Sequence, residues 1–183
     1  MKSVEIYTDG SCEPNPGPGG WGYVILENGY EDFTDYGGAI DTTNNRMEIM
    51  AVIEAMNQFE YPVEATIYSD SKYVVNGITS WVDGWERNNY KDGTIKNRDL
   101  WMLISDHKTA HNIKAKWVPA HMGVKYNEQA DRLAEKGRLQ LGGVSRVEPN
   151  VRTGIYIDVN NHDRKDVARL KKYLKRNKWE YTS

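Results

Sequence analysis

Residues 4–12, Val-Glu-Ile-Tyr-Thr-Asp-Gly-Ser-Cys, open the chain with alternating apolar and polar side chains that run directly into Asp9-Gly10-Ser11. Such alternation is typical of a strand with one buried face, and an Asp-Gly pair is typical of a turn. We therefore predict a strand that ends at Asp9, followed by a loop over the glycine- and proline-rich residues 13–20. The sequence thus predicts a carboxylate at the end of a buried strand.

Beyond residue 20 the pattern predicts two more strands and then an alternation of helices and strands. Residues 22–26 and 32–40 are separated by Glu27-Asn28-Gly29, whose turn chemistry predicts an antiparallel meander. The later predicted elements are a helix capped by Asn45, a strand at 65–69, a helix at 71–76 stopped by Gly77, a short helix and exposed loop at 81–98, a helix at 98–111, a strand at 113–117 and a helix at 127–139. This order predicts an α/β fold with function outside the carboxyl ends of its parallel strands.

Four acidic residues occupy positions from which they can converge. Asp9 and Asp70 follow predicted strands, Glu48 lies in the first turn of the helix capped by Asn45, and Asp131 lies on the last helix. Each acid alone has an ordinary structural explanation, as a turn, capping or solvated residue. Together they match what a hard cation such as Mg²⁺ requires, namely several carboxylates that meet at one rim.

The composition excludes several other kinds of site. A single cysteine rules out an internal disulfide, and with four scattered histidines it makes a Cys/His zinc site an unfavourable interpretation. The sequence has neither a long apolar run nor an apolar N-terminal stretch, so we expect no membrane insertion and a cytoplasmic location. We also expect a monomer.

The charge distribution divides the chain. Residues 1–140 carry 14 Lys and Arg against 21 Asp and Glu, whereas residues 141–183 carry 10 against 5. Residues 141–154 have linker composition, and residues 155–183 predict a strand followed by a basic helix. We expect a catalytic domain over 1–140, a linker over 141–154 and a basic C-terminal extension over 155–183.

Four motifs resemble those of a known family, in both composition and order. The motifs are Tyr7-Thr8-Asp9-Gly10-Ser11-Cys12, Thr43-Asn44-Asn45-Arg46-Met47-Glu48, Tyr68-Ser69-Asp70-Ser71 and Trp117-Val118-Pro119-Ala120-His121 with Asn127-Glu128-Gln129-Ala130-Asp131. They closely resemble those of the type 1 ribonucleases H, over about residues 4–140. The resemblance implies a ribonuclease H-like fold, with a five-stranded mixed sheet of three antiparallel and then parallel strands flanked by helices.

The resemblance also implies an activity and its cofactor. The enzyme would cut the RNA strand of an RNA·DNA hybrid and leave 5′-phosphate and 3′-hydroxyl ends. Asp9, Glu48, Asp70 and Asp131 would hold two Mg²⁺ ions during catalysis, with Mn²⁺ as a possible substitute. His121, on the loop before the last helix, would move a proton or assist product release.

The same resemblance implies the residues that contact the hybrid. Cys12, Asn15 and Asn44 would lie in the minor groove, where 2′-hydroxyls distinguish ribose from deoxyribose. The residues expected on the DNA side are Thr43, Asn45 and Trp81. Lys72 stands where relatives often carry glutamine, and it is either a phosphate contact near the metals or a solvated lysine.

Two hypotheses stay open on the sequence alone. Residues 1–140 are acidic, which does not favour binding of a polyanion. The basic extension therefore either adds contacts to the hybrid, or docks on the catalytic domain with its charges solvated. The alternative to an enzyme is a catalytically silent module that binds RNA·DNA hybrids. The presence of all four acids argues against it, since clustered carboxylates without metal would repel phosphate.

Overall fold

The computed structural model describes residues 1–143 and 155–156 of the chain, and its side chains as far as residue 140. The strands are β1 (Lys2–Cys12), β2 (Gly17–Glu27), β3 (Tyr30–Thr42), β4 (Val63–Ser69), β5 (Asn112–Trp117) and β6 (Ile155–Tyr156). The helices are α1 (Asn44–Met56), α2 (Lys72–Asn76), the π-helical turn η1 (Gly77–Trp81), α3 (Val82–Arg87), α4 (Asn89–Gly93), α5 (Arg98–Ala110) and α6 (Lys125–Gly143). None of the helices in this described part is long and apolar enough to span a membrane.

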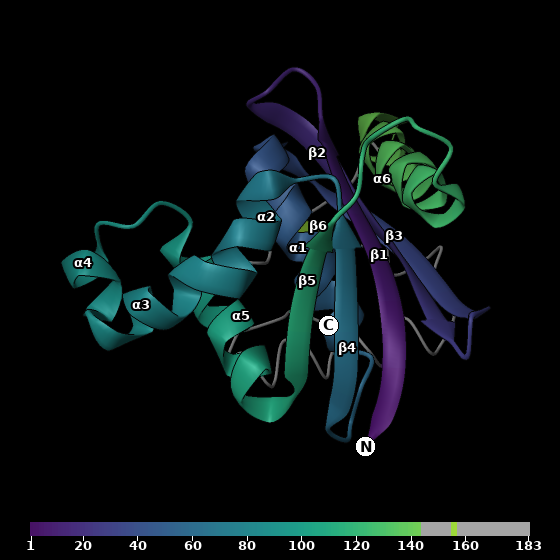
Figure 1. The fold of residues 1–183 in the computed structure, drawn as a ribbon. Coiled ribbons are helices and arrows are strands. Elements are labelled where there is room, and N and C mark those ends of the chain that lie inside the picture. The colour runs from purple at the N-terminus through teal and green to yellow at the C-terminus, as the bar shows by residue number, and fades with distance from the viewer. Residues whose placement is uncertain (144–154, 157–183) are drawn as a thin grey trace.

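The predicted mixed sheet is confirmed. Its strands lie in the order β5-β4-β1-β2-β3-β6 (Figure 1), with β2 antiparallel to its neighbours β1 and β3, and with β4 and β5 parallel to β1. The sixth strand, β6, comes from the predicted extension and pairs antiparallel with β3 at Gly38 and Ala39. The rest of that extension, including its predicted helix, lies outside the described residues.

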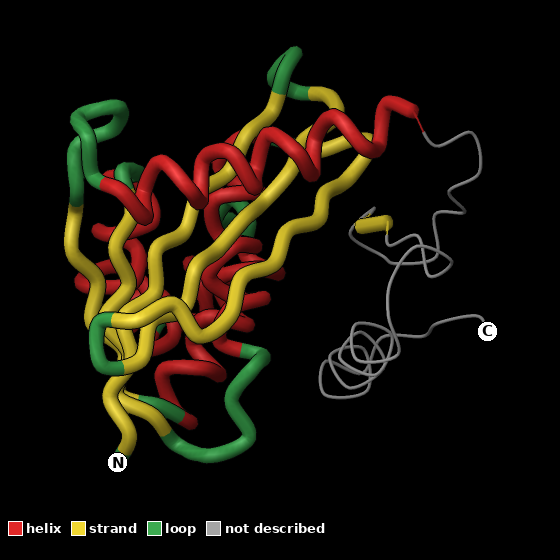
Figure 2. Tube along the Cα trace, turned by 90° about the vertical axis from the view of Figure 1, so that its right-hand side faces the viewer, coloured by secondary structure: helices red, strands yellow, loops and turns green. Residues whose placement is uncertain are grey.

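Helices cover the two faces of the sheet unequally. The apolar face of the sheet packs against α1, which is buried on nearly all sides and which also contacts α5. On the other face α6 lies across β1, β2 and β3 (Figure 2). Seen from that side in Figure 1, β4 and β5 have no described helix in front of them. This part of the sheet is therefore open to solvent.

A close contact between glycine and backbone sets the position of α6. A Cβ atom at Gly20 of β2 would lie 2.1 Å from the carbonyl oxygen of Ala134 and 2.3 Å from the backbone nitrogen of Arg138. Only glycine allows the helix to approach the strand this closely. Because Asp131 is on the same helix, the contact also determines how near this acid comes to the sheet.

The N-terminal predictions were wrong in two details. β1 does not end at Asp9 but continues to Cys12, and β2 already begins at Gly17, so the loop is shorter than the predicted 13–20. Ser11 and Cys12 pair with Gly20 and Gly19, and this ladder outweighs the loop-like composition. Asp9 therefore lies inside a strand rather than at its end.

Helix boundaries also differ from the predictions. The N-cap of α1 is Thr43 and not Asn45, since the Thr43 hydroxyl accepts a hydrogen bond from the backbone N–H of Arg46 (3.2 Å). Glu48 is consequently the fifth helical residue and lies beyond the first turn. α2 ends at Asn76 with Gly77 as its C-cap, as predicted, but the backbone of Gly77 stays helical and leads into η1, and its missing side chain leaves room for the ring of Trp101.

The last predicted boundary lies farther along the chain. α6 continues to Gly143, four residues beyond the predicted helix end at Leu139. The first three residues of the predicted linker 141–154 are therefore helical, and the remainder is outside the described residues.

Candidate active site

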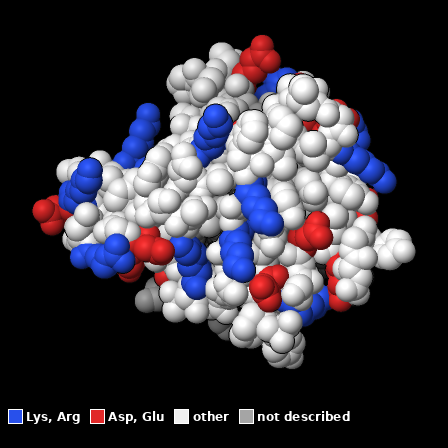
Figure 3. Space-filling model, viewed as in Figure 1, with Lys and Arg blue, Asp and Glu red and all other residues white. Residues whose placement is uncertain are grey.

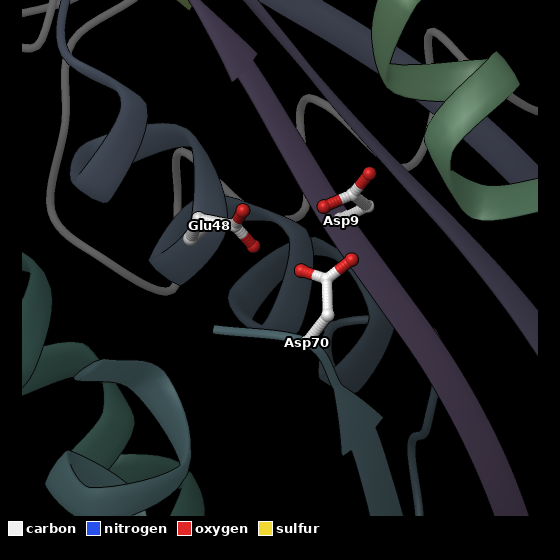
Figure 4. A group of neighbouring side chains, drawn as sticks. All are labelled: Asp9, Glu48 and Asp70. Carbon is white, nitrogen blue, oxygen red and sulfur yellow. The ribbon is translucent and has the colours of Figure 1, made fainter. Parts of the chain in front are cut away.

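Three of the predicted acids converge at one place. Asp9 lies within β1, Glu48 on α1 and Asp70 directly after β4, and each offers a carboxylate oxygen within 4.8 Å of the other two. Figure 4 shows the three carboxylates pointing toward a common centre. The pairing of β1 with β4 brings Asp9 beside Asp70, and Glu48 reaches them from the opposite face of the sheet.

The glycine after Asp9 allows Glu48 to enter this group. A Cβ atom at Gly10 would lie 2.4 Å from the backbone nitrogen of Glu48. Any side chain at Gly10 would therefore push α1 away from β1. The Asp-Gly pair that predicted a turn in fact serves a close approach between a strand and a helix.

The electrostatics of the three acids show that their negative charges are poorly compensated within the protein. Burial, then the charge of Asp70 and an interaction with Asp131, raise the pKa of Asp9 from 3.8 to about 8. Burial and the charges of Asp9 and Asp70 raise the pKa of Glu48 well above its ordinary value. The pKa of Asp70 is raised mainly by burial, although a hydrogen bond from Asn127 lowers it.

These three residues fit a bound cation. Asp9 and Glu48 are 5% and 4% exposed, and the Oε2 atom of Glu48 is buried with no hydrogen-bond partner among the described residues. A buried, unpaired carboxylate oxygen facing two other carboxylates is costly unless a positive charge balances it. The donor set consists of oxygen alone, which suits a hard divalent metal ion.

The fourth predicted acid, Asp131, does not belong to this tight group but is close enough to affect it. It lies on α6, is half-buried and contributes to the raised pKa of Asp9. One turn later on α6, Glu135 accepts a hydrogen bond from the Ser11 hydroxyl (3.1 Å) and pairs with Arg138. Ser11 is two residues after Asp9, so this contact ties the strand of one acid to the helix of the other.

Two residues that hold Asp70 were not assigned a role from the sequence. The amide of Asn127 donates to the Asp70 carboxylate (3.4 Å), and the indole N–H of Trp117 donates to the Asp70 backbone carbonyl (3.0 Å). Asn127 is 1% exposed. Its position four residues before Asp131, on the same face of a helix, was the signal available in the sequence.

Comparison with known proteins identifies the family. The family model described as RNase H matches residues 1–138 of the chain. The chain belongs to the ribonuclease H family. Ribonuclease H from Rhizobium meliloti (strain 1021) is 46% identical over 140 residues, which cover 75% of this chain and 91% of that relative. Ribonuclease HI from Brucella melitensis biotype 1 is 45% identical over 140 residues, covering 75% and 90%.

The fold agrees with this assignment. The solved structure of LC11-RNase H1 in complex with an RNA/DNA hybrid matches with a TM-score of 0.61 at 23% identity, covering 76% of this chain and 99% of that one. The resemblance to ribonucleases H that the motifs indicate, and the fold that it implies, are therefore confirmed.

In this ribonuclease H, the predicted minor-groove residues lie together near the end of β1. The backbone N–H of Asn44 donates to the side-chain oxygen of Asn15 (3.2 Å). The Cys12 thiol lies 3.4 to 3.5 Å from the carbonyl oxygens of Pro14, Gly17 and Thr42. Contacts among these loops thus bring Cys12, Asn15 and Asn44 into one cluster.

The residues predicted to meet the DNA side begin at the same helix start. Asn45 is exposed and Thr43 is half-buried, with its hydroxyl engaged in capping α1. Trp81 is 38% exposed, and its ring stands 6.0 Å from that of Tyr73 and 5.7 Å from that of Trp85. Of these aromatic side chains, Trp81 presents a face to solvent.

Arg46, to which the sequence analysis gave no role, links these two groups. Its guanidinium donates to both carboxylate oxygens of Asp99 (3.0 and 2.7 Å) and to the side-chain oxygen of Asn97 (3.3 Å). Asn97 in turn donates to the hydroxyl of Tyr73, which packs against Trp81. The start of α1 and the aromatic cluster are therefore held in a fixed relation.

Lys72 and His121 lie on either side of Asp70. Lys72 is exposed, with its ammonium group 5.2 Å from the centre of the Trp117 ring. His121 is exposed on the loop before α6, with a left-handed backbone (φ 53°), and its charge lowers the pKa of Asp70. Both side chains are free to face a ligand at the acids.

Proposed function

We propose that this ribonuclease H hydrolyses the RNA strand of RNA·DNA hybrids and leaves 5′-phosphate and 3′-hydroxyl ends. The observation that carries the proposal is the convergence of Asp9, Glu48 and Asp70 within 4.8 Å in a chain of this family. The related LC11-RNase H1 has been solved in complex with an RNA/DNA hybrid, which supports the same class of substrate.

The metal ions would be Mg²⁺, two during catalysis, with Mn²⁺ as a substitute. Asp9, Glu48, Asp70 and Asp131 would hold them, because these residues offer oxygen ligands and an uncompensated negative charge. When bound, such ions lower the pKa of a water molecule and stabilise charge on the departing oxygen. The protein itself then needs no nucleophilic side chain.

The other residues around the acids orient groups and move protons. Asn127 and Trp117 hold the carboxylate and the backbone of Asp70, so this side chain keeps one orientation toward the centre. His121 is exposed on a loop beside Asp70 and would help move a proton to the departing 3′-oxygen, or assist product release.

Recognition of the hybrid would use both strands. Cys12, Asn15 and Asn44 form a cluster of small polar groups suited to read 2′-hydroxyls in the minor groove. On the DNA side, Thr43, Asn45 and Trp81 would contact the sugar-phosphate backbone. Lys72 would add a phosphate contact beside the acids.

We also propose the division into a catalytic domain over 1–140, a linker and a basic extension that strengthens binding to the hybrid. Truncation after Gln140 would test the extension, but it also removes β6, which pairs with β3. Replacing Lys171, Lys172 and Lys175 by glutamine keeps β6 in place and is the cleaner test. If this variant has the KM and the salt dependence of the wild type, the proposal that the extension strengthens binding to the hybrid is contradicted.

A monomer in the cytoplasm is the proposed working form. The cytoplasmic location is supported by the cysteine content, since a single cysteine forms no internal disulfide. Sedimentation of the purified protein across a range of concentrations would test the monomer.

Asp70→Asn is the sharpest test of the catalytic proposal. The variant should keep its fold and its binding to a labelled hybrid, yet cleave it only at background level. Asp41→Asn, at an exposed acid, is the matched control and should cleave like the wild type. Hybrid binding without cleavage by the wild type in Mg²⁺ and Mn²⁺ would instead identify a silent binding module.

A further inference from the structure

The open part of the sheet carries a row of aromatic and basic side chains. In the strand register, Tyr7 of β1 is paired with Tyr68 of β4, and Tyr68 with Lys116 of β5. Side chains paired in this way project on the same face of a sheet. That face is the one without a described helix over β4 and β5 (Figure 1).

The rings in this row pack directly against one another. Tyr7 and Tyr68 are stacked, with ring centres 4.7 Å apart and planes 15° apart, and Tyr126 tilts against Tyr7 at 5.6 Å. The ammonium group of Lys125 lies 5.0 Å from the centre of the Tyr126 ring. We call Tyr7, Tyr68 and Tyr126, together with Lys116 and Lys125, the tyrosine row.

The tyrosine row does not belong to the core of the protein. On β1 and β4, the residues that pack into the core alternate with Tyr7 and Tyr68, which are only half-buried. Lys116 and Lys125 are exposed. Two partly exposed tyrosines on an uncovered sheet face, with a third at the start of α6 packed against them, form a surface suited to binding a ligand.

The charges near the row favour an anionic ligand. Lys114, two residues before Lys116 on β5, projects on the same face, and Figure 3 shows Lys and Arg side chains gathered over the middle of this face. Apart from the acids of the candidate active site, the acids nearby are Glu5 and Glu64, of which Glu64 is 4.0 Å from the Lys114 ammonium group. Beyond the active site, the three lysines at 114, 116 and 125 therefore outnumber these two acids around the row.

The row begins immediately beside the candidate active site. Tyr7 is two residues before Asp9, and Tyr68 is two residues before Asp70. Residues two apart on a strand share a face and lie about 7 Å apart. A nucleic acid strand that reaches the acids needs to extend only by about one nucleotide to meet the first ring.

We propose that the tyrosine row binds single-stranded RNA that continues from the hybrid beyond the cleavage site. The proposal rests on the proposed function, because it takes the RNA strand to be the one held at the acids. Bases would stack on the exposed ring surfaces, while Lys116 and Lys125 contact phosphates.

The test compares hybrids that differ only in a single-stranded extension. Four substrates are cleaved under the same conditions: a blunt hybrid, a hybrid with a 5′ RNA extension of ten nucleotides, one with a 3′ RNA extension of the same length, and one with a DNA extension. We expect one of the RNA extensions to lower KM by about five- to tenfold, the effect of one stacked base at the low end of the usual range. Cleavage of the blunt hybrid tests the proposed function separately.

Variants then assign the effect to the row. Tyr68→Ala, and the double variant Lys116→Ala with Lys125→Ala, should remove the advantage of the extension while cleaving the blunt hybrid as the wild type does. Tyr68→Phe keeps the ring and should retain the advantage, which separates stacking from a folding defect. Lys136→Ala is the matched control, because Lys136 also lies over a tyrosine ring, at 4.8 Å from the centre of Tyr36, but this ring is on β3 and not in the row.

Two results would overturn the proposal. One is that no RNA extension changes KM in the wild type, and the other is that the advantage survives both Tyr68→Ala and the double lysine variant. A DNA extension that acts as strongly as RNA, or a second copy of the chain seated on this face in sedimentation experiments, would also contradict it. Loss of the advantage in the row variants alone supports it.

Discussion

Replacing Asp9 by asparagine should stabilise the metal-free protein, although it should abolish catalysis. The folded protein holds a proton on Asp9 up to a pKa of about 8, whereas the ordinary value is 3.8. Between these values the folded state binds more protons than the unfolded chain, so stability falls as the pH rises through this window. Asparagine resembles the protonated acid in shape and carries no charge, so the variant escapes this loss.

The size of the effect follows from the shift. At about 1.4 kcal/mol per pH unit, a rise from 3.8 to about 8 sets a ceiling of about 6 kcal/mol at pH 8. Asp70, whose charge is a main cause of the shift, is only half-buried, so water and counterions reduce the repulsion. We expect about 2 kcal/mol, or roughly 4 to 8 °C in Tm for a protein of this length.

The measurement is thermal unfolding in the presence of a chelator from pH 4 to pH 9. Glu54, whose pKa burial also raises to about 8, gives both proteins the same trend, so its contribution cancels in the difference between them. The difference should vanish at pH 4 and be largest at pH 8, and Mg²⁺ should stabilise only the wild type appreciably. A variant less stable than the wild type at pH 8, or a difference independent of pH, would refute the reasoning.

Three further predictions concern the scaffold of the site. Glu135→Gln should lower kcat several-fold and leave KM for the hybrid unchanged, since its contact with β1 positions the helix of Asp131; equal changes in kcat and KM would count against this role. Gly20→Ala should cost at least about 2 kcal/mol in urea unfolding by forcing α6 off β2. Gly84→Ala should be neutral or stabilising, because a Cβ atom there would meet only the end of the Arg87 side chain, at 3.9 Å. Burial alone would raise the pKa of Asp99, but the hydrogen bonds and the charge of the Arg46 guanidinium lower it. Asp99→Asn should therefore destabilise the protein by up to about 1 kcal/mol at pH 7, and progressively less as the pH falls below 4. Urea unfolding of both proteins at pH 7 and below pH 4 would measure this.

The sequence predicted the fold and the positions of the acids well because both depend on local patterns. Alternation identified β1, β4 and β5, and Asp70 does follow a strand as expected. Family motifs added the order of the sheet, which periodicity alone does not determine. Asp9 and Glu48 were placed on the right elements, although the predicted strand end and helix cap were wrong.

Several of the errors share one physical cause. At Gly10 and Gly20 the sequence pattern indicates a turn and a loop, but in both cases the missing side chain admits another part of the chain. Local propensity cannot distinguish a glycine needed for a turn from one needed for a close approach. Long-range contacts such as that between Ser11 and Glu135 lie beyond any local pattern for the same reason.

The electrostatics explain why the acidic body does not prevent binding of a polyanion. The charges of Asp9, Glu48 and Asp70 are concentrated in a buried group that two divalent cations would balance together with Asp131, so repulsion of phosphate would be largest in the metal-free protein. The lysines, in contrast, are exposed, and Lys114, Lys116 and Lys125 supply the positive charge along the tyrosine row. The charge that a strand of RNA meets is therefore the local one, and along the tyrosine row, beyond the acids, lysines outnumber carboxylates. For this reason, the net negative charge of residues 1–140 is compatible with a nucleic acid as the substrate. The affinity for the hybrid should depend on the metal even where the metal does not touch the bases.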